Sequence, residues 1–124
     1  MSLLLDTHVL LWWLGDDDRL TPPMRTAIED PQTSVAVSAA SAWEMAIKAA
    51  LGKLSAPDDL GAQLAHNGFE SLPVTLEDGL AAGALPRHHE DPFDRMLIAQ
   101  AARRRLVVVT ADRRFADYDV LTLA

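Results

Sequence analysis

The stretch "DPFDRMLIAQAARRRLVVVTAD", residues 91–112, contains a strong helix pattern followed by the clearest strand pattern in the chain. Its apolar residues recur first at helical spacing, which predicts a helix from Asp91 to Arg104. The run from Val107 to Thr110 is β-branched throughout and predicts a strand buried on both faces. A helix that leads directly into a buried strand is typical of α/β proteins with a parallel sheet.

The rest of the chain alternates in the same way between short strand patterns and helix patterns. Further strands are expected at Ser2–Leu5, Val35–Ser38, Phe69–Val74 and Asp119–Leu123. Further helices are expected at His8–Leu14, Pro22–Ile28, Ala39–Leu51, Pro57–His66 and Thr75–Ala84. This alternation predicts an α/β fold with a central, mostly parallel sheet covered by helices on both faces.

Some positions within these elements are expected to have particular roles. Pro73 cannot donate a backbone hydrogen bond, which places its strand at an edge of the sheet. Gly52 suits the position just after a helix end. Leu76 and Leu80 are expected to face inward from their helix, and Trp43 is expected in the core or in an interface.

The composition limits the kind of protein. The 124 residues, of which 49% are hydrophobic, suit one domain with a sizeable core. The absence of cysteine excludes disulfides, thiolate metal sites and cysteine nucleophiles. Asp6 and His8 interrupt the apolar N-terminus and no basic segment precedes it, so neither a signal peptide nor a membrane span is expected. We therefore expect a cytoplasmic protein, residues 1–124 forming a single domain.

Four acidic residues are predicted to meet at one edge of the sheet. In a parallel sheet, the C-terminal ends of the strands and the N-terminal ends of the covering helices share an edge, where ligand sites form. One acid follows each of two strands, and one lies near the start of each of two helices. These are Asp6, Asp112, Glu44 and Asp94.

Such a group of carboxylates favours a bound cation. Carboxylates a few ångströms apart repel each other strongly, so they either take up protons or bind a cation. Oxygen ligands suit Mg²⁺ or Mn²⁺, and two such ions are a common device for hydrolysing phosphodiesters. Bound cations would also offset a net charge of -7 at pH 7, which otherwise makes the chain a poor partner for a polyanion.

The basic residues are few and unevenly placed. Arg103 to Arg105 end a helix at the opposite edge of the sheet, where cations are favoured by the helix dipole, so we do not assign them to a substrate. The arginines nearer the predicted site are Arg87, Arg95, Arg113 and Arg114. His88 and His89, beside Glu90 and Asp91, could form a metal cluster, but adjacent histidines do not share a helical face, so a solvated loop is expected instead.

Each acid also has a purely structural alternative. Asp91 fits the N-cap of its helix, and Asp94 resembles the acidic end of a capping box, although Asp94 also continues the buried stripe. Glu44 could pair with Lys48 on a solvated face. Asp112 could be a turn residue before the arginines that follow it, and Asp6 could be the N-cap of the first helix.

Four segments resemble one family in register: "LLLDTHVLLWW" from Leu3, "SAASAWEMAIKAALGKL" from Ser38, "HHEDPFDRMLIAQA" from His88 and "LVVVTADRRF" from Leu106. They are similar to the PIN-domain nucleases, and more closely to the VapC-type toxins of bacterial type II toxin–antitoxin modules. The resemblance covers nearly the whole chain. It implies a three-layer α/β/α fold and endoribonuclease activity that depends on Mg²⁺ or Mn²⁺ and uses a metal-activated water.

The resemblance also assigns individual residues and partners. The family's metal-binding, catalytic tetrad matches Asp6, Glu44, Asp94 and Asp112. Thr110 matches a small hydroxyl residue that is often found beside the fourth acid. Thr110 or Thr7 is therefore expected to orient a ligand or a water. Asp91 is expected to cap its helix or to support the ligands. The implied partners are RNA, a second copy of the chain in a homodimer, and an antitoxin whose C-terminal segment covers the active site.

Two other classes of function stay open at this point. A phosphatase or a phospho-accepting receiver domain also places an aspartate after its first strand, but the second acid of such a phosphatase and the late lysine of a receiver are both missing. A PIN-like domain that only sequesters a protein or RNA partner is the other alternative, against which the intact acidic set argues.

Overall fold

The computed structural model describes all 124 residues, with five short strands in one sheet. The strands are β1 Ser2–Leu5, β2 Ser34–Ser38, β3 Glu70–Leu72, β4 Val107–Val109 and β5 Thr122–Leu123. Their order in the sheet is β3-β2-β1-β4-β5, and all four neighbouring pairs are parallel. The predicted parallel sheet is confirmed, with β3 at an edge as Pro73 requires.

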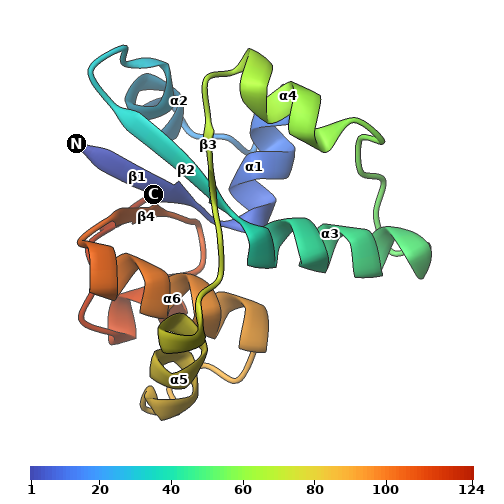
Figure 1. Ribbon diagram of the computed structural model, residues 1–124. Coiled ribbons are helices and arrows are strands. Elements are labelled where there is room, and N and C mark those ends of the chain that lie inside the picture. Colours follow the sequence, from blue (N-terminus) through green and yellow to red (C-terminus); the bar gives the residue numbers. More distant parts are fainter.

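Six helices connect the strands. They are α1 Thr7–Leu14, α2 Pro22–Glu29, α3 Ala39–Ala50, α4 Leu60–His66, α5 Leu76–Ala84 and α6 Pro92–Arg104, and a short 3₁₀ helix covers Arg113–Asp117. Figure 1 shows α1, α2 and α4 on one face of the sheet and α5 and α6 on the other, which makes a three-layer α/β/α arrangement. All of the helices are too short or too polar to cross a lipid bilayer.

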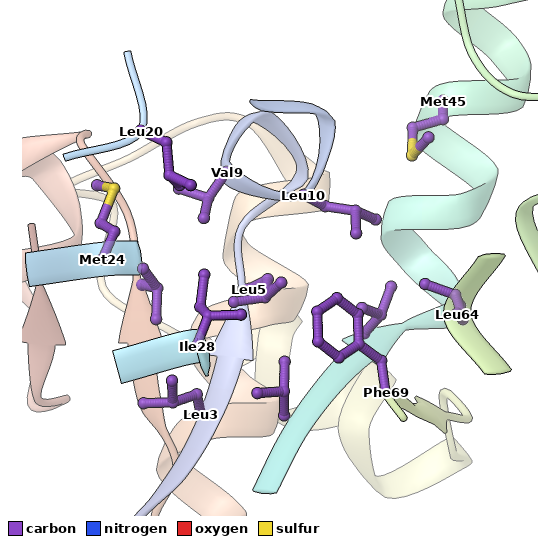
Figure 2. Packing of buried hydrophobic residues seen from close by; sticks show 13 residues of the cluster. Leu3, Leu5, Val9, Leu10, Leu20, Met24, Ile28, Met45, Leu64 and Phe69 are labelled. Carbon is purple, nitrogen blue, oxygen red and sulfur yellow. The ribbon is translucent and has the colours of Figure 1, made fainter. Parts of the chain in front are cut away.

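The strand side chains alternate between two cores, as the pleat requires. Leu3 and Leu5 face the larger cluster, in which they pack against the helices of the first face (Figure 2). Leu4 faces the opposite way, toward Leu97 and Ile98 of α6. Because both faces are covered, the central strand β1 has no solvated side, which explains its unbroken leucine run.

The predicted elements are present with shorter or shifted ends. The helix expected from Pro57 begins only at Leu60, after a turn that contains Asp59. The strand expected over 69–74 is reduced to Glu70–Leu72, because Pro73 cannot continue the hydrogen-bonded ladder. The last strand is likewise reduced to Thr122–Leu123.

The expectation for the inward face of α5 is wrong. Leu76 and Leu80 are 76% and 67% exposed, whereas Asp78 is completely buried. Asp78 accepts hydrogen bonds from Arg103 and Arg104, whose charges compensate its desolvation. A buried ion-pair cluster therefore sets the orientation of this helix, and its leucines face solvent.

Candidate active site

The C-terminal edge of the sheet brings the predicted acids together. Asp6 follows β1, Asp112 follows β4, and Glu44 and Asp94 lie in the N-terminal halves of α3 and α6. Burial, followed by the nearby carboxylates of Asp91, Asp6, Glu44 and Asp112, raises the pKa of Asp94 to about 8. These carboxylates are thus close enough to Asp94 to disfavour its ionisation.

Asp6 is held rigidly by the N-terminus of α1. Its Oδ1 accepts hydrogen bonds from the backbone N–H groups of His8 and Val9, at 2.7 and 3.1 Å. Its Oδ2 accepts one from the Thr110 hydroxyl at 2.6 Å. The N-cap role given above as the structural alternative for Asp6 is present, and the cap places the carboxylate at the site's edge while only 5% of the residue remains exposed.

Thr110 links two of the acids that come from different strands. Besides donating to Asp6, its Oγ1 accepts a hydrogen bond from the backbone N–H of Asp112 at 3.0 Å. One buried hydroxyl therefore fixes the end of β4 relative to the end of β1. The expectation that Thr110 orients a site carboxylate agrees with this geometry.

Glu44 is buried between a hydroxyl and an ammonium group. Thr7 Oγ1 donates to Glu44 Oε1 at 2.7 Å, and Lys48 Nζ lies 2.5 Å from Oε2. The alternative pairing of Glu44 with Lys48 is present, but the Glu44 carboxylate is buried and does not lie on a solvated face. Glu44 is only 2% exposed, so the pair is not a surface ion pair.

Asp91 caps α6, and Asp94 does not take part in a capping box. Asp91 Oδ1 accepts from the backbone N–H groups of Phe93 and Asp94 at 2.8 and 3.1 Å. A capping box would require the Asp94 side chain to accept from the Asp91 N–H. That N–H donates instead to Nδ1 of His89 at 3.2 Å, so the Asp94 carboxylate is left for the site.

His89 is a member of the site that the sequence did not predict. It was expected in a solvated loop, but it is 2% exposed, and its Nε2 lies 2.8 Å from Asp94 Oδ2 and 3.3 Å from Asp112 Oδ2. Because Nδ1 accepts from Asp91, the ring proton belongs on Nε2, facing the two carboxylates. The sequence feature that could have indicated this role is the position of His89 in the loop that leads into α6 at the acidic edge of the sheet. His88 remains exposed.

Asp112 combines a turn role with a place in the site. Its Oδ1 accepts from the Arg114 backbone N–H at 2.9 Å, and the guanidinium of Arg114 binds both carboxylate oxygens at 3.0 and 2.8 Å. Hydrogen bonding from Arg114, with a smaller contribution from His89, lowers the pKa of Asp112. The turn alternative is therefore present without removing this acid from the cluster.

The arginines expected near the substrate are only partly free. The Arg95 guanidinium donates to the backbone carbonyl of Ala82 near the end of α5 and to those of Leu85 and Pro86 in the loop before α6. It therefore stabilises the loop that carries His89. Arg103 and Arg104 bind Asp78 on the other side of α6, in agreement with leaving them unassigned.

The donor set fits a hard divalent cation. Atoms of His89, Asp94 and Asp112, one from each residue, lie within 4.8 Å of one another, so one ion can bridge the two carboxylates beside the His89 ring, whose protonated Nε2 does not ligate it. Burial and the neighbouring carboxylates raise the pKa of Asp94, and a bound cation would favour its ionised form by adding positive charge beside it. Carboxylate-rich sites of this kind suit Mg²⁺ or Mn²⁺.

Comparison with known proteins agrees with this geometry. The sequence matches the family model of the PIN domain over residues 3–121. The chain belongs to the PIN-domain family. The family predicted from the four motifs is thereby confirmed.

Individual relatives of this PIN domain are of the VapC type. Ribonuclease VapC22 of Mycobacterium tuberculosis is 32% identical over 120 residues, which cover 94% of this chain and 92% of that protein. VapBC2 from Rickettsia felis, solved with a promoter DNA fragment, has a TM-score of 0.72 at 13% identity over 99% of this chain and 98% of that chain. A toxin–antitoxin complex from Klebsiella pneumoniae has a TM-score of 0.70 at 17% identity over 99% and 97%. These two likenesses show the three-layer fold.

Proposed function

We propose that the protein is a metal-dependent endoribonuclease, the toxin of a cytoplasmic type II toxin–antitoxin module, with residues 1–124 forming a single PIN domain. The observation that carries this proposal is the convergence of four carboxylates and His89 at the C-terminal edge of the sheet. Burial, together with the neighbouring carboxylates, raises the pKa of Asp94 to about 8, and strongly perturbed carboxyl groups of this kind are typical of functional sites. The relative of VapC type named a ribonuclease supports the same activity.

The residues proposed to hold Mg²⁺ or Mn²⁺ are the catalytic acids Asp6, Glu44, Asp94 and Asp112. When bound, one or two such ions would stabilise the negative charge that develops on the phosphate oxygens during hydrolysis. Thr7 and Thr110 fix the rotamers of Glu44 and Asp6 through hydrogen bonds of 2.7 and 2.6 Å. Asp91 supports the site from outside it, by holding the N-terminus of α6.

His89 is proposed to position two of these acids. Its Nε2 lies between the Asp94 and Asp112 carboxylates and its Nδ1 is held by the Asp91 N–H. The ring therefore sets the spacing between two side chains that would otherwise repel each other. Burial in a packed loop prevents this ring from turning away.

The proposed partners are RNA as substrate, a cognate antitoxin that blocks the active site, and a second copy of the chain. Two of the solved relatives are toxin–antitoxin assemblies, which supports the antitoxin. For a homodimer the chain offers an apolar groove of about 400 Å³ between the starts of α3 and α6. Trp43, which is 64% exposed, lies on its rim with its ring 5.3 Å from that of Phe93. Trp43 is therefore not a core residue.

The decisive experiment measures cleavage of end-labelled cellular RNA by the purified protein with Mg²⁺, with Mn²⁺ or with EDTA. We expect discrete products only with a divalent cation, and at least about 100-fold slower cleavage by Asp94→Asn. Arg105→Glu, at the far edge of the sheet, is the matched control and should cleave normally. Cation binding without cleavage of any RNA by the wild-type protein would favour a binding module instead.

A further inference from the structure

A polar groove of about 570 Å³ opens beside the acidic centre, between α1 and the C-terminal end of α3. The side chains that give it its character are two aromatic rings and three cations. They are His8, Trp12, Arg19, Lys48 and Lys53, and the groove also contains one acid, Asp17, which pairs with Arg19. A concentration of cations is unusual in a chain whose net charge is -7.

The groove begins at the site itself. Lys48 lines the groove, and its Nζ lies 2.5 Å from Oε2 of Glu44. His8 also lines it, and the backbone N–H of His8 is hydrogen-bonded to Asp6 at 2.7 Å. An RNA strand whose reacting phosphodiester lies at the acids would therefore place its next nucleotides in this groove.

One wall of the groove carries the only two lysines of the sequence. Gly52 adopts a φ of +70° after α3 and donates to Ala49, while the N–H of Lys53 donates to the carbonyl of Lys48 at 2.8 Å. This pattern is a Schellman motif, which reverses the chain over the last helical turn. The reversal keeps both lysines at the same end of the helix. Lys53 is exposed and has no ion-pair partner.

The other wall presents flat surfaces. The rings of His8 and Trp12 follow each other along α1, with centroids 6.4 Å apart and planes inclined by 47°. The guanidinium of Arg19 lies 5.3 Å from the Trp12 ring and is fixed by two hydrogen bonds to Asp17 at 3.0 and 2.7 Å. Aromatic and guanidinium planes are the groups on which unpaired bases stack.

We infer that this groove binds the single-stranded RNA on one side of the cleaved phosphodiester. Lys48 and Lys53 contact its phosphates, and His8, Trp12 and Arg19 stack with its bases. The inference rests on the proposed ribonuclease function and adds where the strand lies. It also explains how an acidic protein holds a polyanion, because the required positive charge is concentrated next to the acids.

Binding of a labelled single strand tests the inference without depending on cleavage. The probe is a fluorescein-labelled single-stranded RNA of about 12 nucleotides, followed by anisotropy with Asp94→Asn as the background protein in Mg²⁺. Adding Lys53→Glu should weaken binding by about tenfold and reduce the slope of log K against log salt by about 0.7–1. Adding Arg105→Glu makes the same change in net charge at the far edge and should alter neither quantity.

A second variant separates stacking from charge. His8→Ala should weaken binding several-fold and leave the salt slope unchanged, because stacking releases no counterions. In the otherwise wild-type protein, Lys53→Glu should raise KM for RNA with little change in kcat. Circular dichroism of each variant checks that the fold is intact.

The outcomes distinguish this inference from the function on which it rests. If the wild-type protein cleaves RNA but Lys53→Glu binds and responds to salt like Arg105→Glu, the groove assignment is overturned and the ribonuclease stands. If no RNA is cleaved at all, the proposed function fails while the anisotropy still reports on the groove. Unchanged RNA binding with weakened binding of the antitoxin would assign the groove to a protein partner and overturn the inference.

Discussion

His89 Nε2 lies 2.8 Å from Asp94 Oδ2, in a site where Asp94 is surrounded by other carboxylates. The opposite ring nitrogen accepts the N–H of Asp91, the N-cap of the same helix. One buried imidazole thus joins the cap of α6 to the carboxylate that the helix presents to the site. The two ring nitrogens have different roles. Nδ1 accepts a hydrogen bond that holds the loop, and Nε2 faces the carboxylates of the site.

Substitution of His89 should separate these two roles. His89→Ala leaves the Asp91 N–H without its acceptor and should lower the free energy of unfolding by about 1–3 kcal/mol. His89→Asn keeps an acceptor near the position of Nδ1, so it should recover much of that stability while RNA cleavage stays low. Urea denaturation and the cleavage rate measure the two effects. His88→Ala is the exposed control, and equal losses from both histidines would contradict a special role for His89.

Asp94 should make the metal-free protein less stable as the pH rises. Its pKa is about 8 in the folded protein against an ordinary value of 3.8, so the native state keeps a proton that the unfolded chain releases. The stabilisation is therefore complete at low pH and is lost as the pH rises toward and through the folded pKa. In EDTA, the melting temperature of the wild type should fall between pH ~5 and pH ~9 more steeply than that of Asp94→Asn.

The same pair of proteins tests the proposed metal site at constant pH. Mn²⁺ should raise the melting temperature of the wild type in proportion to the logarithm of its excess over Kd. Asp94→Asn should lose most of this shift, whereas Asp91→Asn should retain it because asparagine is also a good N-cap. A full Mn²⁺ shift in Asp94→Asn would remove Asp94 from the ligand set.

Thr110 should act through the acids that it connects. Thr110→Val removes the donor to Asp6 and the acceptor for the Asp112 N–H, so we expect a loss of about 1–3 kcal/mol in stability and a lower kcat. Thr110→Ser retains the hydroxyl and should restore kcat more than stability. Matching kcat values for the valine and serine variants would show that the hydroxyl is not needed for positioning.

The sequence was sufficient to predict the fold and to place the four acids at one edge of the sheet, because both depend on local order. Asp6 directly follows a strand and Asp94 begins a helix, so the polarity of the elements places them at the same edge without any knowledge of packing. The N-caps at Asp6 and Asp91 were likewise readable, since a cap is a property of a few adjacent residues.

His89 could not be found in this way because its burial depends on a contact between distant segments. The loop before α6 is folded by Tyr118, whose hydroxyl accepts from the backbone N–H groups of His88 and His89 at 3.1 and 2.9 Å and donates to the carbonyl of Pro86 at 2.6 Å. The loop itself is polar and has no apolar periodicity, which is typical of solvated loops. Its position is therefore decided by a residue almost 30 positions further along the chain.

The orientation of α5 was wrong for a related reason. Apolar spacing favoured Leu76 and Leu80 for the core, but the buried position belongs to Asp78. Its partners, Arg103 and Arg104, lie in α6, so the pairing appears only when the two helices pack together. A pattern of hydrophobicity cannot anticipate a buried carboxylate that is compensated from another helix.

This cluster should stabilise the protein in a pH-dependent way that is independent of the active site. Hydrogen bonding from Arg104, with further bonds from the Thr75 backbone, Gln100 and Arg103, holds the pKa of Asp78 well below its usual range. A folded-state pKa below the unfolded value stabilises the protein above the unfolded pKa, and this stabilisation is lost as the pH falls through the acid range.

Asp78→Asn should therefore lower the free energy of unfolding by about 1–3 kcal/mol at neutral pH and should flatten its decline between pH ~5 and pH ~2. Urea denaturation across that range measures both effects. Glu77→Gln removes an exposed acid from the same helical turn and should leave the curve unchanged. The Mn²⁺-induced rise in melting temperature should be retained in Asp78→Asn, because the cluster lies on the far side of α6 from the acids. Loss of that rise would show that the cluster and the active site are coupled through the helix.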